Sequence, residues 1–189
     1  VPYVFCQSRQ RIEDVLTLCA IARGETLEEF GQRPGVFSII NTNTPLQYDV
    51  PMTIGVMDMA RHGQPTLITP FVMAGASTPA TIASAMAVTC AEILFGVALA
   101  QLVRPGAPVL FGCASKNVDM KTGAPAYGLA EMMRCTIIGG QMARRYGLPL
   151  RSSNFSASNI PDFASGYESA NAVQSAMAAG ANLLMHAAG

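Results

Sequence analysis

The decapeptide RRYGLPLRSS, residues 144–153, contains the pattern that predicts the fold of this chain. Gly147 permits the left-handed turn that ends a helix, and Pro149 cannot continue one. The run from Leu150 to Ser153 then has the length and polarity of a short strand. The same order recurs at HGQP (62–65) and RPGAP (104–108), and the glycines expected to end helices are Gly24, Gly63, Gly106, Gly147 and Gly180. A repeated helix–glycine–strand order indicates stacked βα units around a parallel sheet.

Six short runs are predicted as strands, because they are apolar without clean alternation, as strands covered on both faces are. They are Pro2–Cys6, Val36–Ile40, Thr66–Thr69, Val109–Gly112, Leu150–Ser153 and Leu183–His186. Helices are predicted near 9–23, 50–62, 79–103, 125–146 and 162–179. Side chains that accept hydrogen bonds from free backbone amides suit helix starts, and the expected N-caps are Ser8, Asp49, Thr78 and Asp162.

Six strands alternating with five helices fit either an open doubly wound sheet or a (β/α)8 barrel. The dinucleotide-binding form of the open sheet is disfavoured, since no G-x-G-x-x-G follows any predicted strand. The chain opens on a strand-like run at Val1 and stops after another at Gly189, so we expect a piece of a longer chain. Six units of a truncated eight favour the TIM barrel. We therefore predict that residues 1–189 form part of a single (β/α)8 barrel domain.

Composition narrows the class of partner and the compartment. Only 13% of the residues are charged, with twelve basic and twelve acidic, so we expect no nucleic-acid binding. This low charge also predicts that much of the surface is covered, either by a missing part of the chain or by a partner. We expect a homo-oligomer. The five cysteines are scattered without a C-x-x-C pair, which favours a reducing, cytoplasmic location.

The segment from Pro79 to Val103 is long and apolar enough to resemble a membrane span. It carries Glu92 and Gln101, it is rich in alanine, and it begins with the capping sequence Ser77–Thr78. We therefore predict a buried or interface helix and no membrane insertion.

Polar residues follow the predicted strands, and in a barrel the carboxyl ends of the strands form the active site. Amides and hydroxyls dominate this set, and paired carboxylates are missing from it. With two histidines and no cysteine–histidine cluster, we expect no metal site. His186, at the end of the last strand, is either a donor or acid at the mouth or a histidine held by a backbone carbonyl. Asp162 is most simply a helix cap.

Several strings carry a specific resemblance. They are IINTNTPLQYD (39–49), TLITPFVMAGASTPATIA (66–83), ALAQLVRPGAPVLFG (98–112), NVDMKTGAPAYG (117–128) and IPDFASGYESA (160–170). Together they resemble the trimethylamine methyltransferase family, collinearly over nearly the whole chain. The resemblance implies a (β/α)8 barrel and transfer of a methyl group from an amine to Co(I) of a corrinoid (cobalamin) protein. The corrinoid would be carried by the cognate partner protein and not bound by this chain directly.

The resemblance also implies a substrate class. Members specific for trimethylamine use pyrrolysine, which this sequence lacks, and relatives without it act on quaternary amines such as glycine betaine. A quaternary ammonium has no lone pair to capture, so its tertiary amine leaves directly, and the enzyme mainly positions and desolvates the reactants. The alternatives are a trimethylamine-specific pyrrolysine enzyme and a non-catalytic barrel that binds betaine or docks a corrinoid protein.

These implications assign roles to the strand-end residues. Aromatic faces would hold the ammonium head, and amides, histidine or arginine would hold its carboxylate, so we expect substrate binding at Asn41, Asn43, Phe71, Tyr127 and Phe155. Catalytic roles are expected for His186 and Asn154. The residues expected to face the corrinoid are Asn117, Asp119, Asn159 and Asp162.

Overall fold

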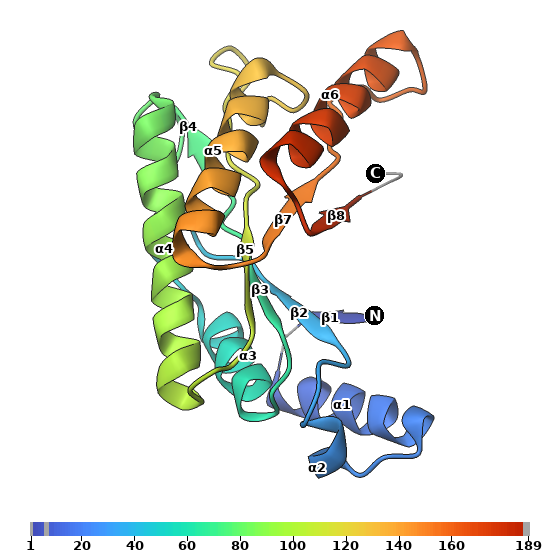
Figure 1. The fold of residues 1–189 in the computed structure, drawn as a ribbon. Coiled ribbons are helices and arrows are strands. Elements are labelled where there is room, and N and C mark those ends of the chain that lie inside the picture. The colour runs from blue at the N-terminus through green and yellow to red at the C-terminus, as the bar shows by residue number, and fades with distance from the viewer. Residues whose placement is uncertain (1, 6–7, 187–189) are drawn as a thin grey trace.

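The computed structural model describes residues 2–5 and 8–186. Its main sheet has six parallel strands in the order β1-β2-β3-β5-β7-β8, and it curls into a half-barrel with helices on its outer side (Figure 1). The strands are β1 (Tyr3–Phe5), β2 (Phe37–Ile40), β3 (Thr66–Ile68), β5 (Val109–Gly112), β7 (Leu150–Ser153) and β8 (Leu183–Met185). The α/β class and the parallel sheet are confirmed, and all six predicted strands are present. The predicted end of the first strand, Cys6, lies outside the described residues.

The helices are α1 (Arg9–Arg23), α2 (Leu27–Phe30), α3 (Val50–Arg61), α4 (Ile82–Val103), α5 (Ala130–Tyr146) and α6 (Phe163–Ala179). All five glycines predicted to end helices have positive φ angles. Three of the predicted N-caps are confirmed, since the side chains of Ser8, Asp49 and Asp162 accept hydrogen bonds from backbone amides of the first turn.

Two predicted helix starts are wrong. Thr81, and not Thr78, caps α4 by accepting a hydrogen bond from the backbone N of Ser84. The helix expected from 125 begins at Ala130, because the backbone before it is used in turns: Ala126 N donates to Asn117 O at 3.0 Å. The prediction also missed α2 and a two-stranded parallel sheet, formed by β4 (Met73–Ala74) and β6 (Lys116–Asn117).

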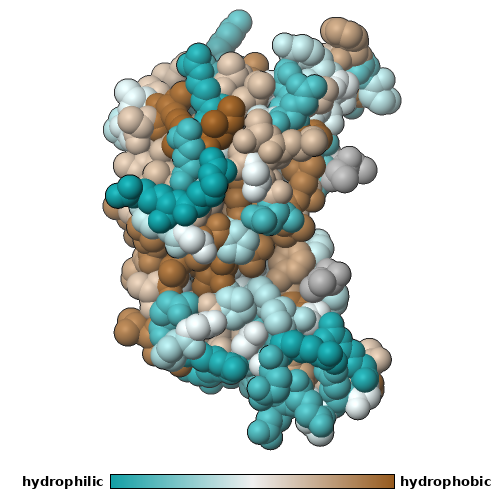
Figure 2. All heavy atoms as spheres, in the orientation of Figure 1, coloured by the Kyte–Doolittle hydropathy of each residue, from teal (hydrophilic) through white to brown (hydrophobic). Residues whose placement is uncertain are grey.

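The core lies between the convex face of the sheet and the helices. It contains Ile12 and Leu16 of α1, Met59 of α3, Ile93 of α4 and Phe111 of β5. The strands approach each other closely at Gly112, where an added Cβ would lie 2.1 Å from Thr69 Oγ1. On the surface, hydrophilic residues gather over α1 and α2 at the lower right, and hydrophobic residues occupy much of the middle (Figure 2).

Helix α4 is long and apolar enough to cross a membrane by length and composition alone. Its buried residues include Met86, Glu92, Ile93 and Ala100, and it packs beside α3 and α5 (Figure 1). Core helices of water-soluble proteins have the same length and composition, so this single helix does not indicate a membrane protein.

Candidate functional site

A pocket of about 350 Å³ opens at the carboxyl ends of the strands, on the concave side of the half-barrel. Its residues come from seven separate stretches of chain, which the parallel sheet brings to one edge. They are Phe5, Ile39, Asn41, Thr69, Phe71, Ala114, Tyr127, Arg151, Phe155 and His186. We call this the mouth pocket.

Aromatic rings form one wall of the mouth pocket. The rings of Tyr127 and Phe155 lie 5.0 Å apart, and Phe155 stacks on His186 with centroids 4.4 Å apart and planes at 29°. His186 follows β8 with a φ of 61°, a left-handed conformation that turns the chain at the end of the strand. This wall can present π faces to a cationic or apolar ligand.

Arg151 supplies the positive charge of the mouth pocket. It lies on β7, is only 3% exposed, and its Nη2 is 3.4 Å from Nδ1 of His186. Its Nε has no hydrogen-bond partner among the described residues. Burial lowers the pKa of Arg151 to about 10, which leaves the guanidinium charged at neutral pH. Burial and, second, the charge of Arg151 lower the pKa of His186, so the imidazole is neutral there.

A second cation lies behind this wall. Lys116 of β6 is fully buried, and its Nζ is 3.2 Å from the ring centroid of Phe71 and 5.4 Å from that of Tyr127. Nζ has no hydrogen-bond partner within the described part of the chain. Burial lowers the pKa of Lys116 to about 7, against opposing effects of the Cys113 and Cys135 thiols. One face of Phe71 is therefore already occupied by a lysine.

Five of the predicted site residues come together in the mouth pocket. They are Asn41, Phe71, Tyr127, Phe155 and His186. The predicted residues Asn117 and Asp119 line a neighbouring hollow of about 540 Å³, which shares Tyr127 with the mouth pocket and includes Met120 and Leu129. We call this the rim hollow.

The other four predicted residues line neither space. Asn43 pairs with Gln47 within its own loop. The side chain of Asn154 donates to Ser169 Oγ at 2.8 Å and so links the end of β7 to α6. Asn159 is exposed, and Asp162 accepts from the backbone N of Ser165 at 2.8 Å as the cap of α6.

Sequence reasoning did not select Arg151 or Lys116. Arg151 gave a signal, because a charged residue within a short buried strand is unusual unless it faces a functional cavity. Lys116 gave none, since its burial depends on a small sheet that pairs two loops. Among the described residues, no group of three His, Cys, Asp or Glu side chains lies close enough to hold a metal ion.

Comparisons of the sequence with known proteins identify its family. The family model described as trimethylamine methyltransferase matches residues 1–189. The chain belongs to the trimethylamine methyltransferase family. It is 36% identical over 97% of its length to a glycine betaine methyltransferase of Desulfitobacterium hafniense, and covers 38% of that protein.

Other relatives in the family carry different substrates in their names. The chain is 32% identical over 83% of its length to a trimethylamine methyltransferase of Methanosarcina mazei, and covers 32% of it. It is 31% identical over 69% of its length to a proline betaine:corrinoid methyltransferase of Eubacterium limosum, and covers 28% of it. The chain thus spans about a third of the length of these curated relatives.

Proposed function

We propose that this chain is part of a methyltransferase that takes a methyl group from a betaine, a quaternary amine with a carboxylate. The observation that carries this proposal is the mouth pocket, which joins an aromatic wall to the buried guanidinium of Arg151. A betaine has the matching pair of groups, a cationic head and a carboxylate. Trimethylamine lacks the carboxylate, and nothing in it would pair with Arg151.

The proposed binding mode follows from the positions of the charges. The trimethylammonium head lies against Tyr127 and Phe155, where ring faces attract a cation by about 1–2 kcal/mol when water is excluded. The carboxylate accepts hydrogen bonds from Arg151, which are stronger than those between neutral groups. Neutral His186 orients Arg151 from the other side. Phe71 contributes less to the head than the sequence predicts, because Lys116 occupies one of its faces.

We propose Co(I) of a corrinoid as the methyl acceptor, carried by a partner protein. When present, the corrinoid would supply the nucleophile for the methyl group, and a tertiary amine would be the leaving group. We place the corrinoid at the rim hollow, which combines the apolar side chains of Met120 and Leu129 with the buried Oδ1 of Asn117, an atom without a hydrogen-bond partner among the described residues. The chain's residues would hold the betaine, exclude water and leave its methyl group facing the rim.

The remaining parts of the proposal concern the whole protein. We propose that the half-barrel belongs to a single complete (β/α)8 barrel, that the enzyme works without pyrrolysine, and that it is a cytoplasmic homo-oligomer. The absence of pyrrolysine from these 189 residues and the 36% identity to a glycine betaine methyltransferase support this choice.

The test is a methyl-transfer assay with the intact protein, cob(I)alamin and four methyl donors: glycine betaine, proline betaine, choline and trimethylamine. We expect methylation of cobalt from one or both betaines. Choline has the same trimethylammonium head without the carboxylate. We expect it to methylate cobalt at least about tenfold more slowly than a betaine, because Arg151 would stay unpaired. Failure of every quaternary amine, with Co(I) present throughout, would refute the proposal. Tight betaine binding without methyl transfer would instead identify a binding subunit.

A further inference from the structure

One buried carboxylate on α4 anchors the loop that follows β2. Glu92 Oε2 accepts hydrogen bonds from the hydroxyls of Thr42 and Thr44, the second at 2.9 Å. Glu92 Oε1 accepts from the backbone N of Leu46 at 2.7 Å. Three donors spread over five residues of loop therefore converge on one side chain.

This carboxylate depends on the loop for its hydrogen bonds. Glu92 is 2% exposed, and none of the ion pairs among the described residues includes it. A buried carboxylate without a cation requires several donors to replace its water shell. The loop supplies them, so the loop and Glu92 hold each other in place.

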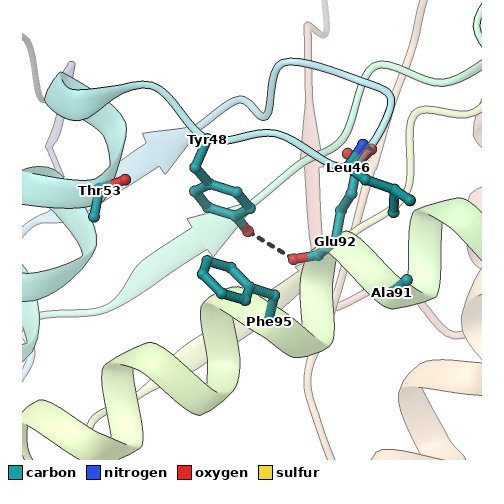
Figure 3. Close-up of a pocket in the computed structure, with 6 residues that line it drawn as sticks. All are labelled: Leu46, Tyr48, Thr53, Ala91, Glu92 and Phe95. Atoms are coloured by element: carbon teal, nitrogen blue, oxygen red, sulfur yellow. Dashed lines mark hydrogen bonds between the residues drawn. The ribbon is translucent and has the colours of Figure 1, made fainter.

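The same turn of α4 makes a second set of contacts with the loop. Tyr48 OH donates to the backbone O of Glu92 at 2.7 Å, and its ring lies 5.1 Å from that of Phe95. Figure 3 shows Leu46 and Tyr48 reaching Glu92 from the loop, with Phe95 beside them on the helix. Within the loop, Asn43 N donates to Gln47 O at 2.9 Å, a bond that ties the loop only to itself.

Asn41 is the link between this anchor and the mouth pocket. It lies between the last residue of β2, Ile40, and Thr42, the first residue bound by Glu92. Asn41 is one of the residues that line the mouth pocket, whereas Glu92 is not. A loop released from Glu92 would move Asn41 while β2 stays paired in the sheet.

We propose that Glu92 is a positioning residue, which fixes Asn41 at the mouth pocket through the hydroxyls of Thr42 and Thr44. This inference rests on the proposed function, because Asn41 matters only if the mouth pocket binds the methyl donor. Glu92 itself touches no reacting group. Its effect on activity must therefore pass through Asn41.

A double-mutant cycle tests this. Glu92→Leu removes the two oxygens that accept the three hydrogen bonds. Glu92→Gln keeps an acceptor for Leu46 N and an amide for the two hydroxyls, and Asn41→Ala removes the group to be positioned. We expect Glu92→Leu to lower kcat/KM for glycine betaine about tenfold or more, mainly through KM. Glu92→Gln should recover most of the loss. In the Asn41→Ala background, Glu92→Leu should cost less than about twofold, since coupled residues are not additive.

Asp58→Asn is the matched control. Asp58 of α3 is also a buried carboxylate, 5% exposed, but it pairs with Arg9 of α1 and Arg61 of α3 and lies outside the mouth pocket. It should lower stability and leave the KM for betaine unchanged. An equal loss from Glu92→Leu in both backgrounds would overturn the proposal, because Glu92 would then act independently of Asn41.

Two further measurements keep the test decisive. If Glu92→Leu does not fold, Thr42→Val removes one loop hydroxyl at nearly constant volume, and the same non-additivity with Asn41→Ala is expected. Calorimetry measures glycine betaine binding without methyl transfer. We expect the effects of Glu92→Leu and Asn41→Ala on Kd to be non-additive as well. A wild-type protein without turnover or betaine binding would refute the proposed function, whereas additive losses in an active protein refute only the role of Glu92.

Discussion

The buried lysine behind the mouth pocket predicts an unusual dependence of stability on pH. Lys116 is fully buried, its Nζ lacks a hydrogen-bond partner within the described residues, and burial lowers its pKa from 10.5 to about 7. At 1.36 kcal/mol per pKa unit, this shift corresponds to a cost of about 5 kcal/mol for the buried charge. Attraction to the ring of Phe71 offsets up to about 2 kcal/mol of it. Lys116→Met should therefore stabilise the protein at pH 6 by about 3–5 kcal/mol.

The sign of the pH dependence follows from which state holds the proton. Below pH 7 both the folded and the unfolded chain carry the lysine charge, so the full cost is present. Between about pH 7 and 10.5 the unfolded lysine keeps its proton and the folded one loses it, so wild-type stability rises relative to Lys116→Met. The difference between the two proteins should narrow by up to about 1.4 kcal/mol per pH unit across this window.

Urea unfolding of both proteins at a series of pH values from 6 to 10 measures this difference. The other titrating groups are common to both proteins, so their contributions to the pH dependence largely cancel in the difference between the two free energies of unfolding. Lys121→Met is the control, because Lys121 is exposed and its loss should change stability by no more than about 0.5 kcal/mol at any pH. A stability difference that stays constant from pH 6 to 10 would refute the reasoning, since Lys116 would then carry no desolvation cost.

Three further predictions concern binding and packing. Arg151→Met should weaken glycine betaine binding about tenfold or more, as measured by calorimetry. Arg145→Met, on the exposed surface of α5, should leave the affinity unchanged. Equal affinities of wild type and Arg151→Met would show that Arg151 does not bind the betaine. Gln64→Leu should lower the free energy of unfolding by about 2–4 kcal/mol. The buried Oε1 of Gln64 accepts from Gly35 N at 2.7 Å, and its Nε2 donates to three backbone carbonyls. A loss below about 1 kcal/mol in urea unfolding would contradict this prediction. Gly166→Ala should raise the midpoint of thermal unfolding and increase the free energy of unfolding by about 0.5–1 kcal/mol. Gly166 lies within α6, and a Cβ added there meets nothing within 4 Å. A lower midpoint would contradict this prediction.

The order of strands and helices was predictable because its signals are local. Glycines at a positive φ end α1, α5 and α6 through their own backbone. Ser8, Asp49 and Asp162 each cap the helix that follows by accepting a hydrogen bond from the backbone N three residues later. The helix starts that failed, at α4 and α5, lie where the preceding chain is held by contacts from elsewhere. There the backbone of β6 pairs with β4, over forty residues earlier in the sequence.

The aromatic wall of the mouth pocket was also predictable, because residues that follow parallel strands reach the same edge of a sheet. Phe71, Tyr127, Phe155 and His186 all line the mouth pocket as their positions after strands suggest. The amides were less predictable. Asn41 and Asn154 both follow strands, but Asn154 turns toward Ser169 of α6 and Asn41 faces the mouth pocket.

The sequence by itself determined the alternation of strand and helix, the parallel class and the edge at which the site lies. Each of these depends on backbone chemistry within a few residues. Only the tertiary structure decided the charges of the site. Arg151 and Lys116 are buried by residues from other strands and helices. Glu92 of α4 likewise holds the 42–46 loop, which is distant from it in sequence. The electrostatics of a buried group depend on everything packed around it, and no local pattern records that.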